Sequence, residues 1–187
     1  MDAKMNKKML GLLQSWIGRT AVGPSTARGM GPAGTIGSAR QFLQTFDLRA
    51  LKVGTASAYR RRLDAATDAL VAALPAGGNH WGSARKFFNI FVRNCSYNRF
   101  LCEAHRLDRM EPWMEIPLDS HVAKGLRTVA ASDCADLPRW TTVIGLTPDV
   151  SDQWQAVARS FAEQEGIHRV HLDVIFWNGA HMQKPSV

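Results

Sequence analysis

Gly82-Ser83-Ala84-Arg85-Lys86 and Pro117-Leu118-Asp119-Ser120-His121-Val122 are the two stretches that organise this chain of 187 residues. The first opens a long apolar run, and the second opens a shorter helical one. Each is predicted to place a reactive side chain, an amine or a carboxylate, in the first turn of a helix. Backbone N–H groups are unpaired there and the helix dipole is positive, so both places favour phosphate and other anions.

The segments around these stretches are predicted to be helical. Apolar residues recur at helical spacing, and the run after Trp81 is rich in phenylalanine, which indicates one buried helix, straight or bent, at the centre of the domain. Thr147-Pro148 begins a further helix that Gly166 ends. The expected helices cover about 4–17, 36–47, 57–74 and 81–107, a short segment after Asp119, and the segment that starts at Pro148.

The run 169–177 fits two patterns. Val170, Leu172, Val174 and Phe176 alternate as in a strand, although the same run also has helical spacing. No second strand candidate exists to pair with it, and a lone strand cannot satisfy its backbone groups. We therefore expect a helix here, and an all-α fold that forms a single domain over 1–187.

Residues 18–37 interrupt the helical pattern, because eight of these twenty positions are Gly or Pro. Both residues oppose a helix interior. The segment also carries Arg19 and Arg28. Two interpretations remain open: a flexible linker, or an ordered loop whose backbone N–H groups and arginines meet phosphate.

The charge balance suits a polyanionic partner. The formal net charge is +7 and the calculated pI is about 9.8. Lys and Arg that neutralise phosphates release condensed counterions, which favours binding to nucleic acid. Many basic domains bind no DNA, however, so charge alone does not decide the partner.

Other features narrow the class of protein. Cys95, Cys102 and Cys134 form neither a paired disulfide set nor a zinc or iron–sulfur pattern, and no apolar run reaches membrane-spanning length. We expect no metal, no cofactor, no membrane partner, a cytoplasmic location and a monomer. His168, His171 and Asp173 invite a metal site, but a buried polar network in which Asp173 ties the last helix to the core is preferred.

Lys86 and Asp119 each have a structural and a chemical interpretation. Asp119 occupies an expected helix N-cap position, and Lys86 could be a solvated lysine or a phosphate contact. Cleavage of the bond between a base and its sugar, however, develops positive charge on the sugar, which a fixed carboxylate stabilises. A neutral amine can attack the same sugar carbon and form a Schiff base.

The two stretches resemble the catalytic half of the helix-hairpin-helix (HhH-GPD superfamily) DNA glycosylases. Gly82-Ser83-Ala84-Arg85-Lys86 is similar to the end of the hairpin, and Pro117–Val122 is similar to the segment with the catalytic aspartate. The resemblance implies a two-lobed helical fold with the active site between the lobes, and a target base flipped into a pocket. It makes Lys86 the Schiff-base lysine and Asp119 the carboxylate. Their 33-residue separation is most similar to the archaeal 8-oxoguanine DNA glycosylase branch.

The same resemblance assigns roles to residues around the site. The hairpin and catalytic segment would span 78–126. The residues expected to contact DNA are Gly82, Ser83, Arg85, Lys124, Arg127 and Arg28. The residues expected to form the base pocket are Trp81, Trp113, His121, Asn94, Tyr97 and Asn98, and Trp140 is a further candidate for stacking.

The sequence therefore predicts a DNA glycosylase that excises a damaged or chemically modified base, with or without Schiff-base lyase activity. Base-excision repair and defence against modified phage DNA need the same machinery. Two other classes remain open. One is a non-catalytic helical DNA-binding protein, and the other is a helical scaffold or protein-interaction domain, which would show no salt-dependent binding to DNA.

Overall fold

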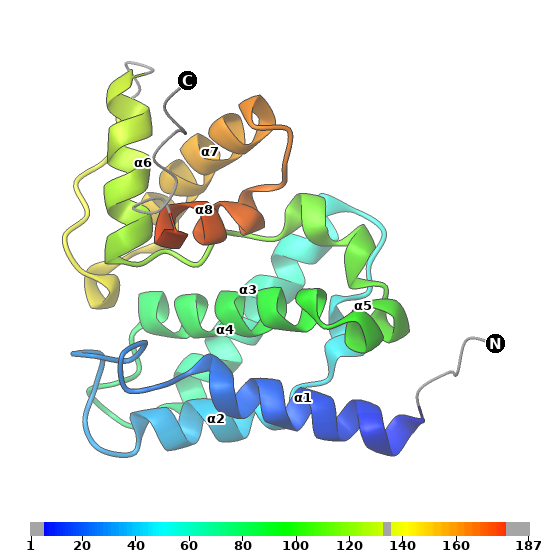
Figure 1. Cartoon of the computed structure of the whole chain (residues 1–187). Coiled ribbons are helices and arrows are strands. Elements are labelled where there is room, and N and C mark those ends of the chain that lie inside the picture. Colours follow the sequence, from blue (N-terminus) through cyan, green and yellow to red (C-terminus); the bar gives the residue numbers. More distant parts are fainter. Residues whose placement is uncertain (1–5, 133–135, 179–187) are drawn as a thin grey trace.

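The structure is a computed structural model that describes residues 6–132 and 136–178 (Figure 1). Within these ranges the chain is helical and contains no strand, which confirms the expected all-α fold. The α-helices are α1 (Lys7–Ala21), α2 (Thr35–Thr45), α3 (Ala56–Ala73), α4 (Trp81–Tyr97), α5 (Arg99–His105), α6 (Ser120–Ser132), α7 (Pro148–Gln164) and α8 (Leu172–Asn178). Short 3-10 helices lie between them: η1 (Leu48–Leu51), η2 (Leu107–Arg109), η3 (Glu111–Trp113), η4 (Val143–Gly145) and η5 (Arg169–His171).

The buried apolar side chains form two clusters. The N-terminal cluster contains residues from Ile17 to Met114, together with Val170, and packs around α4. The C-terminal cluster contains residues from Ile116 to Leu172 and packs between α6, α7 and α8. Figure 1 shows α4 crossing the middle of the molecule, with α1 and α2 on one side and α6, α7 and α8 on the other.

Helix α4 is the centre of the N-terminal cluster, as its phenylalanines indicated. Phe87, Phe88 and Phe91 are fully buried. The helix expected over 81–107 is broken, however, at Asn98. Its side-chain Oδ1 accepts a hydrogen bond from the backbone N–H of Leu101 (3.1 Å) and so caps α5 as a separate helix.

Helix α1 continues to Ala21, which corrects the expectation that the irregular segment begins at residue 18. Gly18 lies where α1 crosses α2, and a Cβ atom there would collide with the backbone of Leu43 and Gln44. Glycine therefore serves close helix packing at this position and does not end the helix. Helix α2 likewise begins at Thr35, so the irregular segment is reduced to residues 22–34.

The remaining helices follow the expected pattern. Helix α3 agrees with the expected 57–74 to within a residue at each end, and Met5, from the first expected helix, lies outside the described residues. Thr147 caps α7 through a hydrogen bond from the Val150 N–H, and Gly166 follows its end with a φ of 68°. Residues 169–177 are helical, as η5 and α8.

None of the helices in the described ranges is long and apolar enough to cross a membrane. Cys95 is buried and Cys102 is half-buried, and both are free thiols. They belong to α4 and α5, on the side of each helix that packs into the N-terminal cluster. Cys134 lies outside the described residues.

Candidate active site

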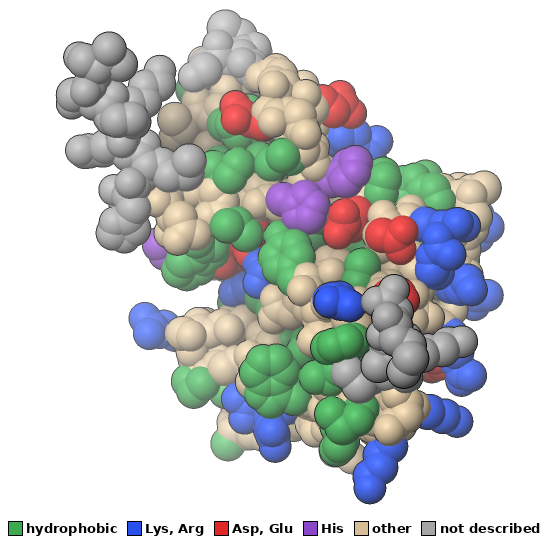
Figure 2. Space-filling view, turned by 45° about the vertical axis from the view of Figure 1, so that its right-hand side comes forward, with side chains coloured by type: hydrophobic (Ala, Val, Ile, Leu, Met, Phe, Trp, Pro, Cys, Tyr) green, Lys and Arg blue, Asp and Glu red, His purple; other side chains and the backbone are tan. Residues whose placement is uncertain are grey.

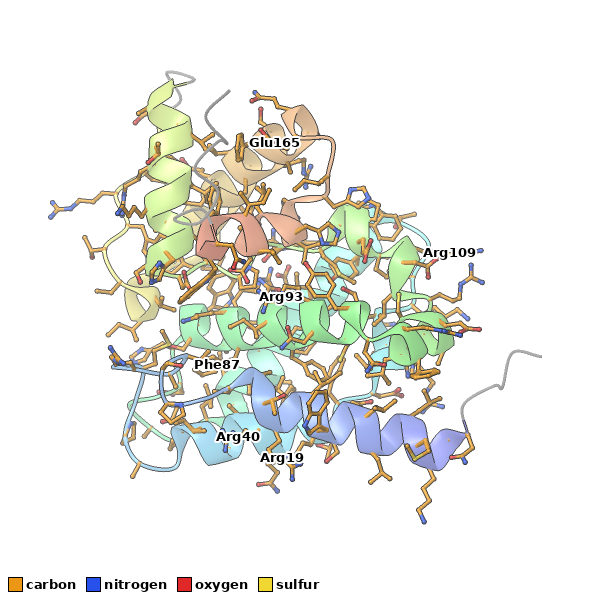
Figure 3. The ribbon with its side chains drawn as sticks, viewed as in Figure 1. Arg19, Arg40, Phe87, Arg93, Arg109 and Glu165 are labelled. Atoms are coloured by element: carbon orange, nitrogen blue, oxygen red, sulfur yellow. The ribbon has the colours of Figure 1, made fainter. Side chains whose placement is uncertain are left out.

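A cavity of about 800 Å³ lies between the two clusters. Its walls come from five parts of the chain: the end of α1 with the loop 22–34, one face of α4, the first half of α6, the segment 140–144, and α8. Figure 3 shows side chains of α4, among them Arg93, directed toward α8 and the start of α6. Lys86 and Asp119 both line this cavity.

Lys86 is the deepest cation of the cavity. The sequence predicted Lys86 in the first turn of a helix. Because α4 begins at Trp81, Lys86 lies instead in the second turn. Its side chain is only 6% exposed, and its Nζ donates a hydrogen bond to the Thr26 carbonyl oxygen at 2.9 Å. Burial lowers the pKa of Lys86, while the charge of Asp119 opposes that shift. The lysine is thus biased toward the neutral amine by its surroundings.

Asp119 caps α6, as its position before Ser120 predicted. One carboxylate oxygen, Oδ1, accepts hydrogen bonds from the backbone N–H groups of His121 (2.9 Å) and Val122 (3.0 Å). Within the described part of the chain, no hydrogen bond engages its Oδ2. The cap fixes the carboxylate in orientation at the positive end of the helix dipole.

The spacing along α4 explains how the cavity wall is built. Lys86, Ile90, Arg93 and Asn94 all line the cavity, at positions i, i+4, i+7 and i+8 of one helix. Residues at this spacing share one helical face. The structure therefore brings an amine from the centre of the N-terminal cluster and a carboxylate from the C-terminal cluster to one cavity.

Arg85, next to Lys86, has a role different from the expected DNA contact. Its side chain is only 2% exposed and is fully engaged by Glu115, through Nε (2.8 Å) and Nη2 (3.2 Å). Nη2 also donates to Asp64 at 2.6 Å, and Nη1 donates to Thr67 at 2.8 Å. A buried and fully paired guanidinium cannot reach a phosphate, so this expectation is wrong.

Gly82 and Ser83 are also buried, which contradicts a contact with DNA. A Cβ atom at Gly82 would collide with the Val143 carbonyl oxygen, so this glycine allows α4 to pack against η4. The Ser83 hydroxyl is inaccessible and has no hydrogen-bond partner among the described residues. The start of α4 is thus a packing contact and not an open anion site.

The other expected DNA contacts lie on the surface. Arg28 and Arg127 are exposed and both line the cavity. Arg127 Nη2 donates to the Trp140 carbonyl at 2.7 Å, and its guanidinium lies over the Trp154 ring, 5.2 Å from the ring centroid. Lys124 is exposed on α6 but does not line the cavity.

The expected base-pocket residues divide into two groups. His121, Asn94 and the additional candidate Trp140 line the cavity. The other four are engaged elsewhere, which contradicts the prediction for them. Trp81 faces the Arg85 guanidinium (5.0 Å), Trp113 packs with Tyr59 (6.3 Å between ring centroids), Tyr97 hydrogen-bonds the His171 Nδ1 (2.9 Å), and Asn98 caps α5.

Two residues of α8, Trp177 and Asp173, line this cavity although the sequence did not place them there. Trp177 is 52% exposed at the rim, and its ring lies 4.0 Å from that of His121, centroid to centroid. Asp173 forms an ion pair with Arg93 of α4. This pair confirms that Asp173 ties the last helix to the core. The only sequence signal for Arg93 as the partner of Asp173 is its position two helical turns after Lys86, on the same face of α4.

The histidines of the C-terminal region lie together near the surface. His168 and His171 have ring centroids 6.2 Å apart, and His171 Nε2 lies 3.7 Å from Glu111. Figure 2 shows histidine side chains side by side on one face, next to acidic ones. In the described ranges, no group of three or more His, Cys, Asp or Glu side chains could hold a metal ion.

Comparison of the chain with known protein families, with curated proteins and with solved structures gives no match.

Proposed function

We propose that this protein is a DNA N-glycosylase that binds a flipped, damaged or modified base in the cavity between its two clusters. The observation that carries the proposal is that Lys86 and Asp119, 33 residues apart in sequence, line one cavity. The two-lobed arrangement of the helix-hairpin-helix glycosylases, with its active site between the lobes, is part of the proposal. A fixed carboxylate and a desolvated amine are the two groups that this reaction requires.

In the proposed reaction, Lys86 Nζ attacks C1′ of the target sugar as a neutral amine. The bond between C1′ and the base breaks, and the base leaves with the bonding electron pair and takes up one proton, while Nζ, now bonded to C1′, loses one. Asp119 faces the sugar and stabilises the positive charge that develops on it. Opening of the sugar ring then gives a Schiff base with Lys86, from which β-elimination cuts the strand on the 3′ side.

The hydrogen bond to Thr26 is compatible with this role. A neutral amine has two N–H groups and one lone pair. One N–H can remain on the Thr26 carbonyl, 2.9 Å from Nζ, while the lone pair faces the cavity. The carbonyl thereby orients the nucleophile.

The surface around the cavity supports binding to a polyanion. Arg28 and Arg127 are exposed at the cavity, and Lys124 is exposed nearby on α6. The net charge of the whole chain is +7. Such side chains would hold the phosphates on either side of a flipped nucleotide.

The decisive experiment uses end-labelled duplexes that each carry one altered base: 8-oxoguanine, uracil, alkylated adenine, or hydroxymethylcytosine with and without a sugar. Each reaction is split and analysed with and without hot alkali, and a third portion is treated with borohydride, which reduces a Schiff base to a stable protein–DNA adduct. Strand cleavage without alkali, together with an adduct, is expected. Cleavage only after alkali would retain base excision and remove the nucleophilic role of Lys86.

Two variants assign the roles of the residues. Lys86→Gln should abolish the adduct, whereas Lys52→Gln, at an exposed lysine outside the cavity, should not. Asp119→Asn keeps a side chain that caps helices equally well, so α6 should stay folded while base release falls by about 100-fold or more. Asp149→Asn in the first turn of α7 is the matched control.

A non-catalytic DNA-binding protein would give a different result. It would bind these duplexes with a steep salt dependence but cut none of them at high protein concentration, with or without alkali. Asp119→Asn would then change neither binding nor stability appreciably. That outcome would overturn the glycosylase proposal.

A further inference from the structure

The cavity contains a second cation and a second carboxylate beside Lys86 and Asp119. Arg93 of α4 forms an ion pair with Asp173 of α8, and all four side chains line the cavity. The Arg93 side chain is 16% exposed and that of Asp173 is 7% exposed. This pair joins the N-terminal cluster to the C-terminal cluster where the reaction is proposed to occur.

Arg93 has two carboxylates within electrostatic reach. It is paired with Asp173, and it also interacts favourably with the charge of Asp119. Lys86 interacts with Asp119 as well. Both cations project from one face of α4, so Asp119 faces two competing positive charges.

The guanidinium is the stronger competitor for a carboxylate. It is planar, always charged and able to donate two parallel hydrogen bonds, whereas the Lys86 ammonium is a point charge on a flexible stem. Lys86 is also held by the Thr26 carbonyl at 2.9 Å. An Arg93–Asp119 pair would neutralise the carboxylate that the proposed reaction needs.

In the structure, Arg93 is engaged by Asp173 and by Asn94. Its Nη1 is paired with Asp173, and its Nε and Nη2 donate to the Asn94 Oδ1 at 3.2 and 3.1 Å. Asn94 is neutral and is the next residue on the same helix, so it offers no charge to hold the guanidinium. Asp173 is the charged partner that holds Arg93.

We propose that Asp173 is a positioning residue, which engages Arg93 and thereby leaves the Asp119 carboxylate available to the sugar. The inference rests on the proposed function of the cavity. It assigns neither Arg93 nor Asp173 a contact with the reacting atoms. Its distinctive consequence is that removal of Arg93 should compensate for removal of Asp173.

The activity test measures base release by three variants. Asp173→Asn, which preserves the shape of the side chain, should lower the rate by about 100-fold, the usual loss of one charge-stabilising group. Arg93→Gln/Asp173→Asn should recover to within about 10-fold of the unmodified protein. Arg93→Gln alone should lose less than the Asp173→Asn variant. A double variant as slow as Asp173→Asn would overturn the inference, because the pair would then be needed for its own sake.

The double variant also covers the case in which Asp173→Asn does not fold. A single unpaired charge is costly to bury, but Arg93→Gln/Asp173→Asn buries none. Its thermal unfolding midpoint establishes that it is folded. Base release near that of the unmodified protein is expected, and a loss of about 100-fold in the folded double variant would contradict the positioning role.

A crystal structure of the Asp173→Asn variant separates this inference from the proposed function. The Arg93 guanidinium should move to within hydrogen-bond distance of the Asp119 carboxylate. A guanidinium that stays beside Asn94, with Asp119 unpaired, would overturn the inference. If the unmodified protein releases no base from any duplex, the proposed function fails, and the crystal structure still decides whether Asp173 controls the position of Arg93.

Discussion

Lys86 is the residue whose chemistry depends most on its surroundings. Burial lowers its pKa, so the neutral amine becomes abundant at a lower pH than for an exposed lysine. Strand cleavage at a pre-formed abasic site should therefore rise with pH and reach half its maximum below the ordinary pKa of lysine. A pH–rate profile measures this directly. A half-maximum at or above the ordinary lysine value would contradict a desolvated nucleophile.

The same profile tests the contribution of Asp119. Its negative charge raises the pKa of Lys86 against the effect of burial. Asp119→Asn removes that charge, so the residual cleavage of abasic DNA should reach its half-maximum at a lower pH than in the unmodified protein. The Asp149→Asn control, in the first turn of α7, should leave the profile unchanged. An unchanged profile for Asp119→Asn would mean that the two charges are independent.

Substitution of Gly82 is predicted to destabilise the fold. A Cβ atom there would collide with the Val143 carbonyl, and it would also lie 2.8 Å from the Leu146 Cβ. Gly82→Ala should lower the free energy of unfolding by about 1–3 kcal/mol, as overpacking does. Gly11→Ala is the matched control, because a Cβ atom at this position in α1 would have no close neighbour beyond the adjoining turns of its own helix, and it should stabilise by about 0.5–1 kcal/mol. Urea denaturation of both variants measures the difference.

Individual residues were predictable where their role is local. Asp119 directly precedes its helix, so its capping role follows from neighbouring residues. Arg85 was misjudged because Glu115, which pairs with it, lies 30 residues away. No pattern around Arg85 distinguishes an arginine that is buried against a distant carboxylate from one that contacts phosphate.

At the scale of elements, the break between α4 and α5 depends on one side chain. The Asn98 amide oxygen accepts the Leu101 N–H at 3.1 Å. Asn98→Ala should cost about 1 kcal/mol of stability through loss of the cap, and Asn98→Asp should retain most of it. Thermal unfolding compares the two. Base release per folded molecule should be the same in both, because Asn98 lies outside the cavity.

The helices themselves were predictable to the extent that their ends are marked by local chemistry. Helix α7 begins after a capping Thr147 and at a proline, and Gly166 follows its end. The end of α1 was misplaced because Gly18 was interpreted as a helix breaker, whereas it accommodates the backbone of α2. Whether a glycine ends a helix or allows a second helix to pack closely depends on the tertiary structure, which local helix propensity does not predict.

At the scale of the whole molecule, an ionic network with the buried Arg85–Glu115 pair at its centre connects distant parts of the chain. Arg85 of α4 pairs with Glu115 and with Asp64 of α3. Arg60 of α3 pairs with Asp152 of α7 at 2.5 Å and lies 3.7 Å from Glu115. The network thus reaches from the N-terminal cluster to α7 on the other side of the molecule.

Removal of one member of this network should be more costly than removal of the central pair. Glu115→Leu leaves the Arg85 charge buried with too few partners and should destabilise by about 3–5 kcal/mol. Arg85→Met/Glu115→Leu removes both charges and should cost less than the single variant. Guanidinium denaturation of the two proteins checks the order. A double variant less stable than Glu115→Leu would show that the remaining partners, not the pair, carry the stability.

The proposed binding to DNA also belongs to the scale of the whole molecule, because many charges would contribute to it. Affinity for a non-cleavable duplex should fall as salt rises, with a slope set by the number of phosphates contacted. Arg28→Gln, at an exposed cavity residue, should reduce that slope by about 0.9. Arg85→Met should leave it unchanged, since Arg85 is buried. Fluorescence anisotropy at several salt concentrations measures both slopes.

The hydrogen bond from Lys86 to the Thr26 carbonyl joins residues 60 positions apart in the chain. It makes the loop 22–34 sensitive to the chemical state of one nitrogen. An ammonium has three N–H groups, a neutral amine has two, and a protonated Schiff base has one. Each of these states keeps at least one N–H, so the hydrogen bond to the Thr26 carbonyl can persist through the proposed reaction. The nitrogen that captures the DNA would then be the same one that anchors the loop beside the cavity, and the loop would stay attached until the Schiff base is hydrolysed.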